Sequence, residues 1–165
     1  MPVCAVIGGT GLTSLSGFTT VREEAVDTPF GDPSSAVIHG ELAGVGMVFL
    51  PRHGEGHTIA PHQINYRANV WALKHVGVTH VLAVNAVGGI CAAAKPGGLL
   101  IPHQIVDYTW SREHTLFCND APVTHVDFTH PYSNRLREVL CEAARKGGIA
   151  VVERGTYGVT ECLRL

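Results

Sequence analysis

A short apolar run near the N-terminus ends in a cluster of glycines, and this pattern constrains the fold more than any other part of the sequence. Val3 to Ile7 (VCAVI) is uniformly apolar, and Gly8-Gly9-Thr10-Gly11 follows it directly. An apolar run of this length is typical of a buried strand, and glycines permit a tight turn at its end. The pattern predicts the first strand of an α/β domain.

Further strands are expected along the chain, alternating with two helices. The strand candidates lie at residues 36–42, 46–50, 80–84, 99–107 with Pro102 inside, 149–152 and 157–160. The helix candidates share apolar residues at helical spacing: Ile64, Ala68, Trp71 and His75 before Gly77, and Leu136, Val139, Leu140, Ala143 and Ala144 between Ser133 and Gly147-Gly148. This alternation predicts the α/β class, with a mixed, largely parallel sheet flanked by helices.

Composition limits the organisation and the partners. The chain has 165 residues, 45% hydrophobic and 16% charged, and no linker divides it, so we expect a single domain over residues 1–165. A net charge of −2 offers no basic field for nucleic acid or for an anionic membrane surface. The odd number of scattered cysteines and the absence of a long apolar stretch favour a reduced, soluble, cytoplasmic protein. The expected partner is a small molecule.

Three loops that follow apolar strands carry groups suited to an anion. They are Gly8-Gly9-Thr10-Gly11, Pro51-Arg52-His53-Gly54 and Asn85-Ala86-Val87-Gly88-Gly89. In open α/β sheets ligands gather at the carboxyl ends of strands, so the loops are expected to converge. Glycines let backbone N–H groups approach an oxyanion, and the Arg52 guanidinium matches two phosphate oxygens at once. Thr10 and His53 add further donors, which together predict a cradle for inorganic phosphate.

Each of these pieces also has an ordinary structural explanation. A glycine turn after a first strand is common in α/β proteins, and Arg52 could pair with a carboxylate on the surface. Dinucleotide and Walker motifs do not fit, because Ser14 occupies the third glycine position and no G-x-x-x-x-G-K-[ST] occurs. The residues alone leave the choice between a phosphate site and a structural turn open.

Other catalytic classes find little support. His53-Gly54-Glu55-Gly56-His57 differs from H-E-x-x-H in the position of its glutamate, and its two glycines disfavour a helix, so we assign no metal site. No G-x-S-x-G elbow is present, and the carboxylates between residues 107 and 127 have no helix to fix their separation. His125, in the long polar connection between Trp110 and Pro131, is kept as a binding candidate.

Taken together, several motifs resemble the purine nucleoside and methylthioadenosine phosphorylase family. The matching stretches are IGGTGL (7–12), DTPFGDPS (27–34), PRHGEGHTIAPHQINYRANVWALK (51–74), NAVGGI (85–90) and HPY (130–132). They occur in order over nearly the whole chain. NAVGGI and VTHVDFTHPY are closer to the methylthioinosine branch than to the methylthioadenosine enzymes.

The resemblance implies a nucleoside phosphorylase-like fold and phosphorolysis of a purine (5′-methylthio)ribonucleoside, which gives free base and (5-methylthio)ribose 1-phosphate. It implies that phosphate, the co-substrate, contacts Thr10, Arg52, His53, Asn85 and Ala86, with no other cofactor. It also implies a homotrimer in which His125 lies near the 5′ substituent in a neighbouring subunit. No catalytic residue is assigned.

The end of the sequence departs from the family pattern. Cys162 and Leu163 stand where glycine and proline are expected, and Leu165 is the last residue, before the segments that read the purine edge in the family. We therefore expect a C-terminally truncated chain with an incomplete sheet. The alternatives are a non-catalytic remnant that binds phosphate and oligomerises, phosphorolysis of methylthioadenosine, inosine or guanosine, and a nucleoside hydrolase, which Arg52 disfavours because a hydrolase needs no anion cradle.

Overall fold

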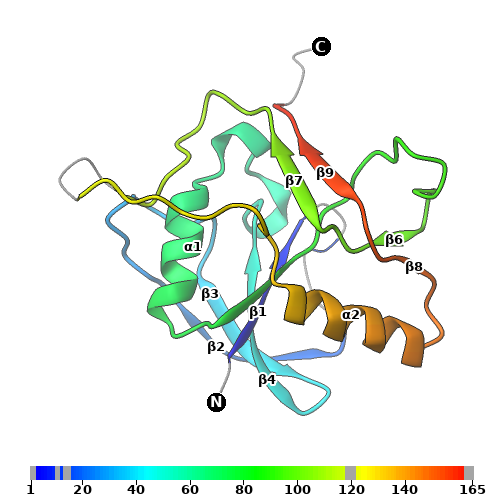
Figure 1. Cartoon of the computed structure of the whole chain (residues 1–165). Coiled ribbons are helices and arrows are strands. Elements are labelled where there is room, and N and C mark those ends of the chain that lie inside the picture. The colour runs from blue at the N-terminus through cyan, green and yellow to red at the C-terminus, as the bar shows by residue number, and fades with distance from the viewer. Residues whose placement is uncertain (1–2, 10–11, 13–15, 118–121, 162–165) are drawn as a thin grey trace. The chain divides into compact units, whose positions relative to one another are not determined.

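The computed structural model describes residues 3–9, 12, 16–117 and 122–161 (Figure 1). Its backbone contacts divide the chain into two compact units. The first contains Met1–Ala86 with Glu113–Leu116, and the second contains Val87–Arg112 with Phe117–Leu165. The expectation of one domain over residues 1–165 stays a prediction.

The first unit is built on a five-stranded mixed sheet in the order β2-β3-β4-β1-β5. Strand β1 is parallel to both β4 and β5, whereas β3 is antiparallel to β2 and β4. The strands are β1 (Cys4–Gly8), β2 (Phe18–Glu24), β3 (Val37–Leu42), β4 (Val45–Pro51) and β5 (His80–Ala83).

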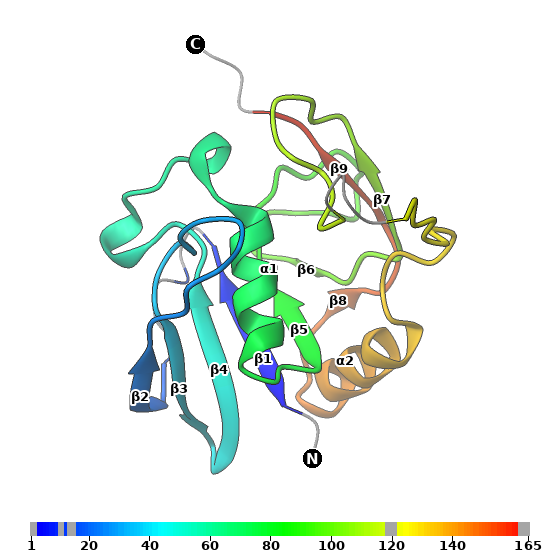
Figure 2. The ribbon, with the colours of Figure 1, turned by 90° about the vertical axis from the view of Figure 1, so that its left-hand side faces the viewer.

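Helix α1 (Tyr66–His75) lies across one face of this sheet (Figure 2). Its N-cap is Asn65, whose side chain accepts a hydrogen bond from the Ala68 N–H. Its buried residues Ala72 and Leu73 complete a core formed with sheet residues Ala5, Val37, Val48 and Leu50 and with Val26, which follows β2. Packing of this apolar stripe, rather than helix propensity, holds the helix on the sheet.

Two asparagines attach the loop between β2 and β3 to α1. The Asn65 side chain donates to the Phe30 carbonyl at 2.6 Å. Buried Asn69 accepts from the Ser34 N–H at 2.7 Å and donates to the Ser34 hydroxyl at 2.9 Å. A buried amide without partners costs free energy, so these bonds fix the loop and the helix relative to each other.

The described residues of the second unit form two parallel strand pairs and one helix. Strand β6 (Leu99–Leu100) pairs with β8 (Val151–Val152), and β7 (Gln104–Asp107) pairs with β9 (Thr156–Val159). Helix α2 (Asn134–Lys146) begins at Ser133, whose hydroxyl accepts from the Leu136 N–H. Arg137 of this helix donates to the carbonyls of Pro102 at 2.8 Å and Glu153 at 2.6 Å, which ties the helix to both strand segments.

The α/β class with a mixed, largely parallel sheet is confirmed, and both expected helices are present. The strand expected over residues 99–107 is instead divided around Pro102 into β6 and β7, which belong to different two-stranded sheets. Strand β2 was not predicted, because its sequence FTTVREE is mostly polar and its interior residues are exposed. The apolar face predicted for α2 was partly wrong: Val139 is 54% exposed, whereas Cys141 is buried. Similarly, His75 of α1 is exposed, while Asn69 is buried. Neither helix is long and apolar enough to cross a membrane within the described part of the chain.

Candidate functional site

Three parallel strands of the first unit end at the same edge of the sheet. In the strand register, Gly8 lies beside Pro51, and Ile7 lies beside Ala83. The ladders continue one residue further, since the Arg52 N–H donates to the Gly8 carbonyl at 2.9 Å and the Val84 N–H to the Ile7 carbonyl at 3.0 Å. The first residues after β1, β4 and β5 are therefore neighbours, as Figure 2 shows for the strands.

Arg52 packs directly on Gly9. A Cβ atom added at Gly9 would clash with Nη2 of Arg52 and would lie 2.6 Å from the Val84 carbonyl oxygen. The guanidinium thus occupies space that any other residue at position 9 would need. Only glycine permits this approach of an arginine from β4 to the backbone beyond β1.

The Arg52 guanidinium has no hydrogen-bond or ion-pair partner among the described residues, where five other ion pairs occur. The residue is half-buried. The alternative left open by the sequence, a surface ion pair between Arg52 and a carboxylate, is not formed among the described residues. A half-buried arginine with free donors is instead suited to an anionic ligand.

His53 follows Arg52 and is only 6% exposed. Its Nδ1 lies 2.8 Å from the Ile59 carbonyl oxygen, and the Ile59 N–H donates back to the His53 carbonyl at 2.9 Å. The side chain and the backbone of one residue are thus both held by the backbone of the other. The imidazole is fixed in orientation next to the arginine.

The turn between His53 and Ile59 has unusual backbone geometry. Gly54, Gly56 and His57 all have positive φ, at 74°, 68° and 59°. The turn includes the short 3₁₀ helix η1 (Glu55–His57) and brings the His57 ring to 4.3 Å, centroid to centroid, from the His53 ring. No group of three or more His, Cys, Asp or Glu side chains placed to hold a metal ion occurs among the described residues.

Asn85 and Ala86 follow β5 on the same edge of the sheet and are exposed. They continue from Val84, whose carbonyl lies beside Gly9. Thr10, the remaining residue of the predicted cradle, lies outside the described residues. Within the first unit the structure thus brings Arg52 and His53 to the edge from which Asn85 and Ala86 extend.

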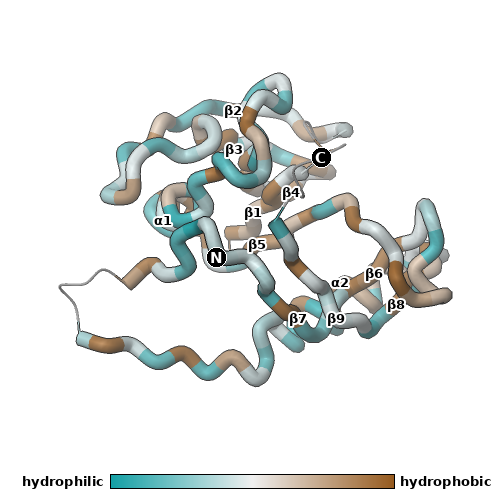
Figure 3. Tube along the Cα trace, turned by 90° about the horizontal axis from the view of Figure 1, so that it is seen from above, coloured by the Kyte–Doolittle hydropathy of each residue, from teal (hydrophilic) through white to brown (hydrophobic). Residues whose placement is uncertain are grey.

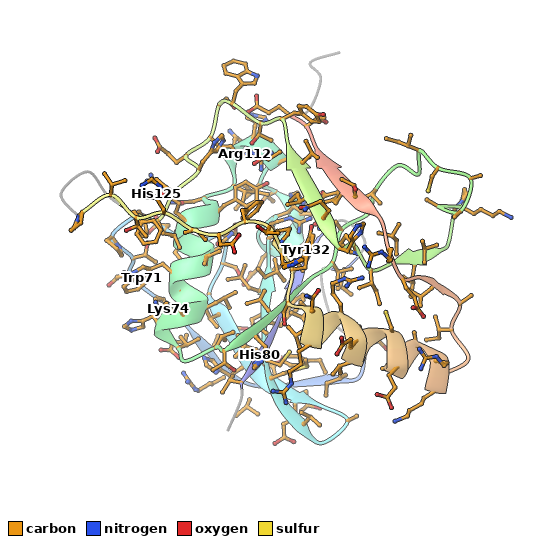
Figure 4. The ribbon with its side chains drawn as sticks, in the orientation of Figure 1. Trp71, Lys74, His80, Arg112, His125 and Tyr132 are labelled. Atoms are coloured by element: carbon orange, nitrogen blue, oxygen red, sulfur yellow. The ribbon has the colours of Figure 1, made fainter. Side chains whose placement is uncertain are left out.

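His125 belongs to the second unit and lies on an exposed segment outside the helices and strands (Figure 4). Along residues 122–128, hydrophobic and hydrophilic residues alternate (Figure 3), and the apolar Val123, Val126 and Phe128 are 84%, 67% and 61% exposed. At the end of the segment, the Asp127 carboxylate accepts from the Thr129 N–H at 2.9 Å. Hydrogen bonds from Thr129 hold the pKa of Asp127 below its usual value.

The family of the chain follows from comparison with known proteins. The profile of the Phosphorylase superfamily matches residues 4–162. The chain belongs to the Phosphorylase superfamily. Its strand-end loops at Gly9, Arg52 and Asn85 all lie inside the superfamily match.

Individual superfamily members are similar over most of this chain. A probable S-methyl-5′-thioinosine phosphorylase of Pseudomonas syringae pv. tomato is 49% identical over 166 residues, which cover 100% of this chain and 68% of that protein. An S-methyl-5′-thioadenosine phosphorylase of Hyperthermus butylicus is 46% identical, over 93% of this chain and 56% of that protein. The resemblance stated from the sequence motifs is confirmed.

A solved structure of the superfamily has the same fold. Methylthioadenosine phosphorylase from Schistosoma mansoni in complex with tubercidin superposes with a TM-score of 0.93 at 35% identity, covering 99% of this chain and 65% of that one. The chain therefore spans between 56% and 68% of the lengths of these three superfamily members.

Sequence reasoning missed two contacts that shape the site. It identified Gly9 only as part of a glycine turn, not as the residue that makes room for Arg52. It did not identify Ile59, whose backbone holds His53. The contact between Arg52 and Gly9 could have been expected from the register of the parallel strands β4 and β1. The contact between His53 and Ile59 involves only backbone atoms of Ile59, so the residue type at position 59 gives no signal for it.

Proposed function

We propose that this chain provides the phosphate-binding part of a nucleoside phosphorylase that cleaves a purine 5′-methylthioribonucleoside. The preferred substrate is S-methyl-5′-thioinosine. Phosphate is the co-substrate, and no metal or organic cofactor takes part. Thr10, Arg52, His53, Asn85 and Ala86 contact the phosphate. The names of the similar proteins, a thioinosine and two thioadenosine phosphorylases, support this substrate class.

The observation that carries the proposal is the Arg52 guanidinium, which lies against Gly9 with no partner among the described residues. It is half-buried at an edge where three parallel strands end. Burying a cation is unfavourable unless an anion or hydrogen-bond acceptors compensate it. Bound phosphate satisfies this requirement and accepts two parallel hydrogen bonds from the guanidinium.

The reaction asks mainly for placement and electrostatics. A phosphate oxygen forms a bond to C1′ as the bond from C1′ to the purine nitrogen breaks, and the electron pair of the broken bond leaves with the purine, which then takes up a proton. Positive charge develops on the sugar, and the bound anion lies beside it. Fixing phosphate in position lowers the entropic part of the barrier.

The oligomeric state and the cellular location are proposed on separate grounds. We infer a homotrimer in which His125 reaches the 5′ substituent bound by a neighbouring subunit, and the exposed apolar side chains of Val123, Val126 and Phe128 support burial of this segment against another chain. We also infer a cytoplasmic protein of purine salvage. Free thiols at Cys4, Cys91 and Cys141 are in keeping with a reducing compartment.

The test is base release from 5′-methylthioinosine, 5′-methylthioadenosine and inosine, each with and without phosphate. The 165-residue chain is compared with a chimera that carries, after its last residue, the additional C-terminal part of the Pseudomonas syringae relative. We expect phosphate-dependent release by the chimera, fastest with 5′-methylthioinosine. Phosphate-dependent release by the 165-residue chain itself would support the proposal more directly.

Two results would contradict the proposal. Base release that proceeds equally without phosphate would indicate a hydrolase. A folded chimera that binds no phosphate and releases no base would indicate that the edge formed by β4, β1 and β5 is not a phosphate site. Faster base release from 5′-methylthioadenosine or inosine would overturn only the proposed preference for the base or the 5′ substituent of 5′-methylthioinosine.

A further inference from the structure

The hydrogen bond between His53 and Ile59 determines which imidazole nitrogen carries a proton. A carbonyl oxygen has only lone pairs, so the contact of 2.8 Å between Nδ1 and the Ile59 carbonyl requires the hydrogen to be on Nδ1. The return bond from the Ile59 N–H to the His53 carbonyl, 2.9 Å long, keeps the two residues in this arrangement. In the neutral ring, Nε2 is therefore an acceptor.

The Nε2 atom is available to a ligand although the residue is buried. It has no hydrogen-bond partner among the described residues. In the same part of the chain, no fully buried side-chain nitrogen or oxygen lacks a partner. Nε2 must then lie in the small accessible part of a side chain whose residue is 6% exposed.

The charged and titratable neighbours of His53 come from the elements around its turn. Arg52 precedes it, directly after β4, and η1 contributes Glu55 and the His57 ring, which is tilted by 40° to the His53 ring at 4.3 Å. The segment through Ile59 contributes no titratable side chain. The loop that touches Gly54 through the Ser34 carbonyl carries Asp32.

We propose that His53 makes the site selective for a tetrahedral anion that brings its own proton, so that phosphate and arsenate are preferred to sulfate. This inference rests on the proposed phosphate site. Phosphate retains one P–OH group above its second ionisation and can donate that proton to Nε2, whereas sulfate carries no proton near neutral pH. Sulfate can bond to His53 only when the ring has taken up a second proton and Nε2 has become a donor.

The same bond orients the anion. The protonated oxygen of phosphate faces Nε2 of His53, which leaves the charged oxygens to the Arg52 guanidinium. An unprotonated oxygen is thereby kept for attack on C1′. His53 is thus a specificity-determining residue of the phosphate site.

The experiment is calorimetric titration of the 165-residue chain with inorganic phosphate, sodium arsenate and sodium sulfate, at about pH 6 and about pH 8.5. At the higher pH we expect phosphate and arsenate to bind roughly tenfold or more tightly than sulfate, since the sulfate oxygen faces an acceptor lone pair. At the lower pH the difference should narrow to a few-fold, because imidazolium donates to either anion.

Two variants separate His53 from its neighbour. His53→Gln places an amide that can donate at both pH values, so sulfate binding should lose its dependence on pH. His57→Gln leaves the bond to Ile59 intact and should keep the selectivity. If His53→Gln does not fold, imidazole ¹⁵N spectra of the unaltered chain at about pH 8.5 give the answer: Nε2 should be unprotonated, and its signal should move when phosphate is added.

A phosphate-to-sulfate ratio that is the same at both pH values, or that survives in folded His53→Gln, would overturn the selectivity. So would an ¹⁵N spectrum with the proton on Nε2 in the neutral ring. Failure of the proposed function looks different, because then none of the three anions would bind at either pH. Binding of all three without pH-dependent selection would leave the phosphate site standing and reject only the role of His53.

Discussion

The guanidinium of Arg52 and the backbone of Gly9 are in direct contact, and this contact joins the ends of two parallel strands. A Cβ atom at Gly9 would clash with Nη2 of Arg52. It would also lie 2.6 Å from the Val84 carbonyl, which belongs to the segment after a third strand. The site therefore depends on the absence of a side chain at position 9 as much as on the presence of a cation at position 52.

Gly9→Ala should weaken phosphate binding at least tenfold and lower the free energy of unfolding by about 1–3 kcal/mol. The added methyl group must displace either the guanidinium or the backbone at Val84. Calorimetry with phosphate and urea unfolding measure the two effects. Gly46→Ala is the matched control, because a Cβ at Gly46 meets nothing within 4 Å. Equal phosphate affinity in both variants would show that Arg52 does not need this space.

Asn69→Ala should lower the free energy of unfolding by about 1–3 kcal/mol, because it leaves the part-buried N–H of Ser34 without its acceptor. Asn134→Ala, which removes an exposed asparagine, provides the comparison and should change stability little. The measurement is urea unfolding of each variant. A loss in Asn69→Ala no greater than in Asn134→Ala would mean that the bonds to Ser34 do not hold the loop on α1.

Glu24→Gln should lower the midpoint of urea unfolding at about pH 7, and the difference from the unaltered chain should fade as the pH falls towards about 3. The hydrogen bond from Arg22 at 2.6 Å, with a smaller contribution from His39 at 2.9 Å, lowers the pKa of Glu24. A carboxyl group whose folded-state pKa is lowered stabilises the fold above its unfolded pKa, and that contribution is lost as the pH falls through the folded value.

The control for this titration is Glu23→Gln on the same strand, since Glu23 is exposed and forms no ion pair among the described residues. Its stability relative to the unaltered chain should vary little with pH. A pH profile of Glu24→Gln that runs parallel to that of Glu23→Gln would show that the contacts of Glu24 with Arg22 and His39 do not stabilise the folded state.

Glu161→Gln should speed amide hydrogen exchange at Trp110 and Ser111. The Glu161 carboxylate accepts from these two N–H groups at 2.8 Å and 2.5 Å, and an amide oxygen is a weaker acceptor than a carboxylate. The Ser111 N–H bond is also the main reason why the pKa of Glu161 is lowered. Glu153→Gln, at a side chain that is 55% exposed, should leave both amides unchanged. Unaltered protection in Glu161→Gln would refute the anchoring role.

The sequence was sufficient to predict the elements that carry the site. Strands β1, β4 and β5 are largely apolar, and Gly9, Arg52 and Asn85 follow them, so the type of these strands and their common edge could be predicted from the pattern and from the geometry of parallel sheets. Strand β2 could not be predicted in this way. Its polar residues make an antiparallel edge strand whose stability comes from pairing with β3 rather than from an apolar face.

The parts of the site that the sequence did not reveal depend on atoms that every residue has. Ile59 holds His53 through its carbonyl and its N–H, so no preference for isoleucine could indicate the contact. Positive φ at His57 is likewise a property of the folded turn. Local sequence patterns therefore predict which side chains lie at the edge of the sheet. They do not predict which hydrogen bonds these side chains form there.

The most direct measurement of the central claim is the affinity of Arg52→Ala for inorganic phosphate, compared with Arg22→Ala. Both variants lose one positive charge, but Arg22 lies on β2, at the other edge of the five-stranded sheet from β5. We predict that Arg52→Ala loses about 2 kcal/mol of phosphate binding, roughly a thirtyfold weaker affinity, while Arg22→Ala binds phosphate as the unaltered chain does. Equal phosphate affinities in the two variants would contradict the claim that Arg52 forms an anion site with the ends of β1 and β5.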